Sequence, residues 1–216
     1  MAFHITVLYD NEAGGHNVQG DWGFSALIEA EGGATVLFDT GADGRILLHN
    51  ATALGVSLRE VSAIVISHWH WDHSGGLPVV LRECPDAHLF VPLVASEHVP
   101  EEQVHIVGPD PVEIAPGVHS TGVLDGIEQS LVLETGQGGC VLMGCAHPGV
   151  GNLLRAAATI TRPAVLLGGL HGFSELSLLE DLDAVYPCHC TQRKREILAR
   201  YPAKARPCAA GVVLNV

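Results

Sequence analysis

Residues 67–73 place four metal-binding side chains within six residues, directly after an apolar run at residues 63–66. These side chains are three imidazoles and one carboxylate, from His68, His70, Asp72 and His73. The apolar run predicts a buried strand, so the four groups would emerge together at one edge of a sheet. Neutral imidazole and carboxylate are donors that suit Zn, Fe or Mn. The segment therefore predicts a metal site, and we expect a pair of metal ions.

Length and composition favour one large aliphatic core. The chain has 216 residues, of which 47% are hydrophobic and only 5% aromatic. This length is enough for one sizeable core and short for two, so we expect a single domain over residues 1–216. The net charge of −13 disfavours a nucleic-acid partner, because an acidic surface repels a phosphate backbone. The expected partner is a small-molecule substrate, with an anionic compound as one option.

Positive charge is concentrated late in the chain, where six of the eleven lysines and arginines lie between residues 193 and 206. We interpret this stretch first as the solvated face of a helix, and alternatively as a rim that attracts anions.

The first residues show no export leader, and no apolar run approaches the ~18 residues of a membrane span. A cytoplasmic protein with six reduced cysteines and no membrane partner is expected.

Hydrophobic patterning predicts strand hairpins first and helix–strand alternation later. Strands are expected at residues 3–9, 24–30, 34–40, 63–66, 89–91, 131–134, 140–143, 164–167, 184–186 and 212–214. Helices are expected at residues 43–54, 77–82, 150–157, 174–182 and 191–200. Ser174 and Thr191 are the expected N-caps of the last two helices. This order predicts sheets with helices on their outer faces.

A pair of metal ions needs about six protein ligands, and three further histidines share the strand-end setting of the motif. His147, His171 and His189 each follow an apolar strand. We assign His147 and His189 as ligands. His171 is kept as an alternative ligand and as a hydrogen-bond donor to substrate, and His119 as a replacement for His147. The histidines at positions 4, 16, 49, 88, 98 and 105 lack this setting.

One carboxylate at the end of an expected strand, and three thiols close to His147 and His189 in the sequence, also bear on the site. Asp39 ends a strand and is the expected hydrogen-bond acceptor for a ligand imidazole. Cys145 lies two residues before His147, so both side chains would share a face if the strand continued. The Cys145 thiolate would then bind or bridge metal, with buried packing as the alternative. Cys188 and Cys190 are interpreted as packing residues, because no second cysteine pair completes a four-cysteine zinc site.

With these residues the chain resembles the metallo-β-lactamase superfamily. The resemblance rests on residues 68–73, on residues 37–41, on a histidine in the middle third and on a histidine after a late strand. It implies an α/β fold, a four-layer αββα sandwich of two mixed sheets with outer helices and a metal centre at one edge. It further implies a first metal on His68, His70 and His147, a second on Asp72, His73 and His189, and Asp39 orienting a ligand.

Three stretches, residues 21–29, 144–149 and 187–191, narrow the resemblance to one subgroup. These are metal-dependent hydrolases related to the methanopterin-pathway ribofuranosylaminobenzene-phosphate synthase. Many superfamily members carry a bridging Asp after a Gly, whereas Cys145 follows Gly144 here. The bridging carboxylate is therefore expected to be absent, and occupancy of the second metal site becomes the question to test.

The resemblance and the ligand types together predict a metallo-hydrolase with one or two divalent metal ions, zinc first and Fe or Mn as alternatives. A metal-bound hydroxide would attack a small ester, phosphoester or similar substrate. Asp72 is the expected catalytic acceptor of the water's proton, and His171 the expected donor to substrate. Two alternatives remain open: a mononuclear-iron oxidoreductase acting on a thiol, and a metal-dependent binding or biosynthetic module for a phosphorylated or pterin-type compound.

Overall fold

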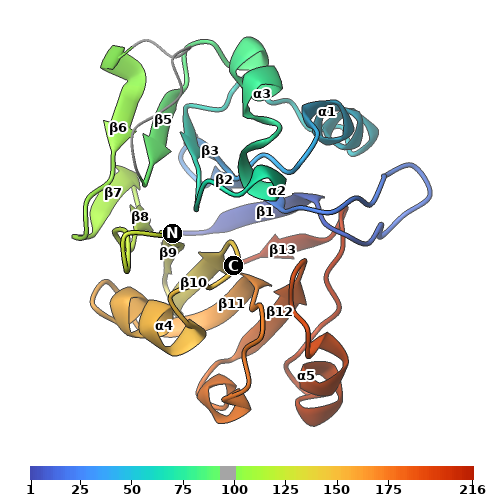
Figure 1. Ribbon diagram of the computed structural model, residues 1–216, viewed down its shortest axis with the longest axis vertical. Helices are drawn as coiled ribbons and strands as arrows, with labels where there is room; N and C mark the ends of the chain where they lie inside the picture. Colours follow the sequence, from blue (N-terminus) through green and yellow to red (C-terminus); the bar gives the residue numbers. More distant parts are fainter. Residues whose placement is uncertain (93–100) are drawn as a thin grey trace.

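Two mixed β-sheets pack face to face at the centre of the molecule, and helices cover the outer side of each (Figure 1). The computed structural model describes residues 1–92 and 101–216. Neighbouring strands within each sheet are partly antiparallel and partly parallel, so both sheets are mixed. This is the four-layer αββα arrangement, and the expected fold class is confirmed.

The first sheet holds the N-terminal hairpins and the strand that carries the metal-binding motif. Its strands are β1 (Phe3–Tyr9), β2 (Ser25–Ala30), β3 (Thr35–Phe38), β4 (Ala63–Val65), β5 (His88–Val91), β6 (Val104–Ile106) and β13 (Val213–Asn215). Strands β1 to β3 pair antiparallel, β3 to β6 run parallel, and β13 pairs with β1 at the edge. The connecting helices are α1 (Gly44–Ala53), α2 (Trp71–Ser74), α3 (Leu77–Glu83) and the 3₁₀ turn η1 (Glu101–Gln103).

The second sheet follows the same plan in the C-terminal half. Its strands are β7 (Val112–Ala115), β8 (Val118–Ser120), β9 (Leu131–Thr135), β10 (Gly138–Met143), β11 (Pro163–Gly169) and β12 (Ala184–Cys188). Strands β7 to β10 pair antiparallel, and β10 to β12 run parallel. The crossovers use α4 (Val150–Ala158) and the 3₁₀ helix η2 (Leu176–Leu179), and α5 (Lys194–Arg200) follows β12.

Alternation along the strands divides the core into three layers. Phe38 of β3 packs in the cluster between the sheets together with Leu142 of β10. Its neighbour Leu37 points the other way, into the cluster that contains Leu47 of α1 and residues of α3. A third cluster buries Leu153 of α4 and residues of α5 against the outer face of the second sheet. The period-two pattern of buried residues is therefore what holds the four layers together.

Two expected helix starts are wrong. The stretch 174–182 forms only the 3₁₀ helix η2, and its first turn has no side-chain cap from Ser174. Helix α5 begins at Lys194, not at Thr191. The Thr191 hydroxyl instead donates to Cys188 O at 2.6 Å and accepts the Leu170 N–H at 3.0 Å. It ties the turn after β12 to the end of β11, and this tertiary contact overrides its capping preference.

Several boundaries also differ from the sequence pattern. β3 ends at Phe38 because Asp39 adopts a left-handed φ of 56°, which no strand residue can have. Strands β6, β7 and β8, the 3₁₀ turn η1 and the short helix α2 were not expected. His98 lies outside the described residues. Within the described parts of the chain, no helix has the length and apolar character needed to cross a membrane.

Candidate metal centre

The expected site residues meet at one edge of the sandwich, at the ends of strands that run in the same direction. They follow β3 (Asp39), β4 (residues 68–73), β10 (Cys145 and His147), β11 (His171) and β12 (His189). Adjacent parallel strands end at the same edge of a sheet, so residues far apart in sequence are gathered here. Left-handed backbone at Asp39, Ala146, His171 and His189, with φ of 56°, 58°, 43° and 43°, turns the chain sharply at this edge.

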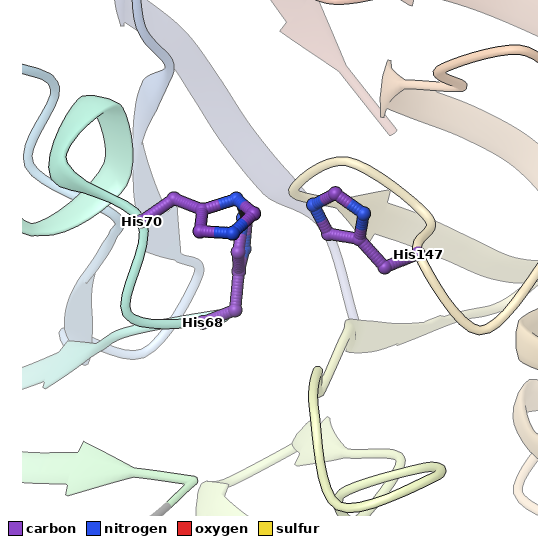
Figure 2. Close-up of side chains that lie close together, drawn as sticks. All are labelled: His68, His70 and His147. Carbon is purple, nitrogen blue, oxygen red and sulfur yellow. Dashed lines mark hydrogen bonds between the residues drawn. The ribbon is translucent and has the colours of Figure 1, made fainter.

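Three imidazoles form the first group of donors. His68 and His70 lie in the turn between β4 and α2 and face His147, which lies in the loop after β10 (Figure 2). One nitrogen of each ring lies within 4.8 Å of the others, and His68 Nε2 is 3.0 Å from His70 Nδ1. His68 is buried, His147 is half-buried and His70 is exposed, so this group opens to solvent.

A second group of donors lies deeper. Asp72, His73 and His189 are all buried, and their donor atoms also lie within 4.8 Å of one another. His189 Nε2 is 3.3 Å from Asp72 Oδ2. The indole N–H of Trp22 donates to the same Asp72 oxygen at 2.8 Å, and its ring meets His189 edge-on at 5.1 Å. Trp22 thus fixes the orientation of the carboxylate from the solvent side.

Asp39 holds the motif in place from behind. Its carboxylate accepts the Ser67 N–H and the Ser67 hydroxyl, each at 2.7 Å. It also lies 2.7 Å from His73 Nδ1, so Nε2 of this imidazole points toward the other donors. The Ser67 hydroxyl in turn lies 2.9 Å from His68 Nδ1. The role expected for Asp39, orienting a ligand imidazole, is the role its geometry permits.

The loop with Cys145 and His147 is held by a residue that sequence reasoning missed. Glu128 is fully buried, and its Oε1 accepts the N–H groups of Cys145 and Ala146 at 2.9 and 3.0 Å. Its Oε2 accepts the His147 N–H at 2.8 Å. Burial raises the pKa of this carboxyl, while the three N–H donors oppose the shift. Glu128 lies between short strands without periodicity, so no local signal marked it.

The turn that carries His189 is fixed by the end of β1. Asp10 accepts the His189 N–H at 2.8 Å. Asn11 donates to His189 O at 3.1 Å, and its side-chain oxygen lies 2.9 Å from His189 Nδ1. These contacts leave Nε2 of His189 free to face Asp72. Both residues directly follow the strand expected at residues 3–9, and no role at the site was expected for them.

Most of these imidazoles are held neutral. Burial, reinforced by neighbouring histidines, lowers the pKa of His68 far below its ordinary value and that of His189 to about 3. Burial also lowers the pKa of His147. For His73, burial opposes protonation, but the Asp39 carboxylate raises the pKa. Neutral imidazole is the form that binds metal, so the cluster is largely prepared for a cation.

The donor set fits a metal ion. Nε2 of His147 and Nε2 of His189 are buried, yet neither makes a hydrogen bond to a described residue; His189 Nε2 has only its 3.3 Å contact with Asp72 Oδ2. An unpartnered buried nitrogen is costly, and a cation bound by each donor group would satisfy the nitrogen that belongs to it. His68 and His189 each have the other ring nitrogen against a side-chain oxygen. That arrangement is usual for imidazoles that bind metal.

Two thiols enter the same site. Cys145 is 3% exposed, and its Sγ lies 3.2 Å from His73 Nε2. Its position does not depend on a continuing strand, because β10 ends at Met143 and the left-handed Ala146 makes a turn. Cys190, which we interpreted as a packing residue, forms a donor group with Cys145 and His189. Cys190 thus lies beside candidate donors and outside the hydrophobic clusters of the described residues, whereas Cys188 lies in the inter-sheet core, as expected of a packing residue.

The remaining histidines fall into two classes. His171 is exposed, and its ring centroid lies 5.2 Å from that of His147, so it borders the site without joining a donor group. His119 lies in β8 and contacts Glu134 at 2.8 Å, away from the cluster. It does not replace His147 among the described donors.

A cavity of about 640 Å³ lies beside the histidines. Its lining includes His147, His171 and the polar side chains of Asn152 and Arg155. Leu170, Phe173 and Leu178 supply apolar surface. The cavity has the size and mixed lining of a small-molecule site.

The basic stretch 193–206 shows features of both a solvated helix face and a rim beside the site. Arg193 pairs with Glu196, Lys194 with Glu12 and Arg200 with Glu180, as expected of a solvated face. Residues 193–195 also line a cavity of about 540 Å³ beside His189. Arg193, Lys194 and Arg195 therefore share a cavity with one of the candidate donors.

Fold and donor pattern define an αββα sandwich with groups of candidate metal donors at one edge. A family model described as the metallo-β-lactamase superfamily matches residues 21–189. The chain belongs to the metallo-β-lactamase superfamily, and the resemblance expected from the sequence is confirmed. Among curated proteins it is similar to the 7,8-dihydropterin-6-methyl-4-(β-D-ribofuranosyl)-aminobenzene-5′-phosphate synthase of Methanocaldococcus jannaschii. The two are 25% identical over 241 residues, covering 81% of this chain and 82% of that protein.

Solved structures agree with this assignment. Tm1679, described as a metal-dependent hydrolase of the β-lactamase superfamily, has a TM-score of 0.78 and 26% identity, with 99% of each chain covered. The metallo-β-lactamase fold protein YhfI from Bacillus subtilis has a TM-score of 0.72 at 12% identity, with 100% of each chain covered. At that identity the second likeness concerns the fold alone. Superfamily membership supports a metal-dependent hydrolase type of fold.

Proposed function

We propose that this protein is a metal-dependent hydrolase of a small ester, phosphoester or similar compound, with one or two divalent ions and zinc as the first choice. The observation that carries the proposal is the convergence of His68, His70 and His147 on one point, with a buried, unpartnered nitrogen on His147. Three imidazoles with an open side are the donor set of a catalytic rather than a structural metal. Zinc, with Fe or Mn as alternatives, suits these donors.

The proposed roles follow from the positions of the side chains. His68, His70 and His147 would hold the first ion, and Asp72, His73 and His189 the second. When bound, such an ion lowers the pKa of a water toward about 7 and polarises the bond to be cleaved. Asp72, fixed through one oxygen by Trp22, is the proposed acceptor of the water's proton. Asp39 keeps His73 in the orientation that this arrangement needs.

We place the substrate in the cavity beside His147. His171 lines this cavity with its ring centroid 5.2 Å from that of His147, and it is proposed to donate a hydrogen bond to the reacting group. Arg155 lies within the lining and would attract an anionic part of the substrate. The leucines and Phe173 would contact an apolar part. A nucleic-acid substrate is not proposed, because the chain carries a net charge of −13.

The test begins with metal-free protein, which is reloaded with zinc, manganese or anaerobic ferrous iron. Each form is assayed on chromogenic carboxylic esters, phosphate monoesters and phosphate diesters. We expect metal-dependent turnover that His70→Ala abolishes. His49→Ala, which changes an exposed histidine outside the site, should keep it. Stoichiometric metal with no hydrolysis of any substrate would contradict the proposal, and oxygen uptake with a thiol would point to an iron oxidoreductase.

A second candidate function has a specific observation in its favour. The relative from Methanocaldococcus jannaschii is named a synthase, so this chain could serve biosynthesis of a phosphorylated or pterin-type compound instead of hydrolysis. The cavity with Arg155 would suit a phosphate group. Calorimetric titration with a reduced pterin and with a ribose phosphate distinguishes the candidates. Tight binding without hydrolysis supports the biosynthetic role, and absence of binding excludes it.

A further inference from the structure

We propose that Cys145 and Cys190 form a sulfur-containing metal subsite with His189, beside the three-imidazole group. The two sulfurs and one His189 nitrogen lie within 4.8 Å of one another. Cys145 also belongs to a donor group with His68 and His73, so its sulfur lies between the two halves of the centre. The inference rests on the proposed metal-dependent function and adds a ligand, Cys190, and a preference among metals.

The location of the six cysteines separates these two from the rest. Cys140, Cys188 and Cys208 lie in the hydrophobic cluster between the sheets, and Cys84 lies in the cluster under α1 and α3. Cys145 and Cys190 belong to none of the hydrophobic clusters formed by the described residues. Their neighbours are imidazoles, and Cys145 Sγ lies 3.2 Å from His73 Nε2. Packing accounts for four thiols and leaves this pair unexplained.

The backbone at the end of β12 explains how Cys190 reaches the site. In a strand, residues 188 and 190 would point to the same face. His189 has a φ of 43°, which breaks the alternation and lets Cys188 face the core while Cys190 faces the donors. A Cβ at position 169 would meet Cys190 Sγ at 2.7 Å and Cys145 Cα at 3.4 Å. Gly169 therefore leaves the space in which the two cysteines approach each other.

Sulfur changes which metal the subsite prefers. Thiolate donors favour zinc or cobalt over manganese or magnesium, which favour oxygen donors. The three-imidazole group alone makes a weaker distinction among zinc, iron and manganese. The inferred subsite therefore predicts that zinc or cobalt fills the second position and that manganese does not. Cobalt reports the ligand type directly, because cobalt–thiolate bonds absorb in the near-ultraviolet.

The experiment is a cobalt titration of the full-length, metal-free, reduced protein without oxygen. We expect the wild type to show thiolate-to-cobalt absorption. Cys145→Ser and Cys190→Ser should each lose about half of it, since each removes one of two sulfur donors, and the double variant should lose all of it. Cys84→Ser is the matched control, because Cys84 is buried away from the site and its hydrogen bond to Leu58 O can be kept by a hydroxyl. It should match the wild type.

A second measurement uses only the wild type and so does not depend on folding of the variants. Iodoacetamide labelling read by mass spectrometry should show that zinc protects Cys190 from alkylation and that manganese does not. Cobalt binding without thiolate absorption, or equal labelling of Cys190 with and without zinc, would overturn the sulfur subsite and leave the proposed hydrolase standing. Failure to bind any metal would instead overturn the proposed function.

Discussion

The Glu128 side chain, which has no solvent exposure, binds the backbone of His147: its Oε2 accepts the His147 N–H at 2.8 Å. The next residue, Gln129, contacts the other half of the site, because its N–H donates to Ser67 O and its side chain to Ile66 O. Residues 128–129 thus connect the loop after β10 to the turn after β4. The relative position of the two donor loops depends on this short segment.

Replacing Glu128 should disturb the metal centre without touching a donor. In Glu128→Gln one of the two carboxylate oxygens becomes an NH₂ group. Only one oxygen is left to accept the three backbone N–H groups, and the new NH₂ group faces at least one N–H that it cannot accept. We expect the free energy of unfolding to fall by about 1–3 kcal/mol and zinc affinity to fall ~10–100-fold. Denaturant titration and competition with a zinc chelator measure the two effects. Glu134→Gln, which alters a half-exposed partner of His119, is the control, and equal zinc affinity in both variants would refute the role of Glu128.

Asp39→Asn tests the orientation of His73. The carboxylate raises the pKa of His73 in the metal-free protein, so the pKa of His73 measured by NMR should fall in the variant. Affinity for the second metal ion should fall ~10–100-fold, because the imidazole loses its fixed orientation. Asp43→Asn changes a surface N-cap that asparagine can also provide, and it should leave both quantities unchanged. An unaltered His73 pKa would show that the contact is not maintained in solution.

Histidine substitutions separate the two metal positions. His68→Ala removes a donor of the three-imidazole group, and His189→Ala removes a donor shared by the deeper groups. Elemental analysis after dialysis should find less metal in each variant than in the wild type. His189→Ala should keep the ion on the three imidazoles. Wild-type metal content in both variants would mean that the assigned ligands are wrong.

Gly144→Ala should damage the site through sterics alone. A Cβ at this position would overlap the Ser67 hydroxyl, which Asp39 fixes in place. Overpacking of this kind costs about 1–3 kcal/mol of unfolding free energy, and we expect zinc affinity to fall as well. Thermal melting with and without zinc gives both values. Gly136→Ala is the control, since nothing lies within 4 Å of its added Cβ; a Gly144→Ala protein as stable as this control would contradict the clash.

Acid should destabilise the metal-free protein through His189. Its pKa is lowered to about 3 in the folded state, against about 6.5 in the unfolded chain. Above pH ~6.5 the imidazole is neutral in both states. Between pH ~6.5 and pH ~3 only the unfolded state takes up the proton. The free energy of unfolding therefore decreases as the pH is lowered through this range, by at most about 1.4 kcal/mol per pH unit. Urea titrations from pH 7 to 4 should show a smaller loss for His189→Gln than for the wild type, and an equal loss would contradict the lowered pKa.

The sequence was informative wherever the pattern is local. Apolar runs placed the buried strands, and their ends placed the motif and the later histidines at one edge. Ser174 and Thr191 misled, because a preference for capping is weak against a tertiary contact such as that of Thr191 with Leu170. Glu128 and Asn11 were missed because each acts on a loop distant in sequence, and nothing in the neighbouring residues indicates that contact.

The positions of the cysteines also depend on backbone conformations that the sequence did not reveal. Spacing suggested Cys145 as a donor, on the assumption of a continuing strand. The structure brings it there by a turn instead, with Ala146 in the left-handed region. Cys190 could not be distinguished from Cys188 by composition or spacing. Only the backbone conformation of the intervening His189 sends the two sulfurs in different directions.

The donors come from both sheets: His68 follows β4 of the first, whereas His147 and His189 follow β10 and β12 of the second. A bound ion would therefore be a cross-link between two halves that otherwise meet mainly through apolar contacts. Thermodynamic linkage then makes fold stability depend on free metal concentration, by about 2.7 kcal/mol at a hundredfold excess over the dissociation constant. Core substitutions that are tolerated in zinc-replete cells should become loss-of-fold substitutions under zinc starvation.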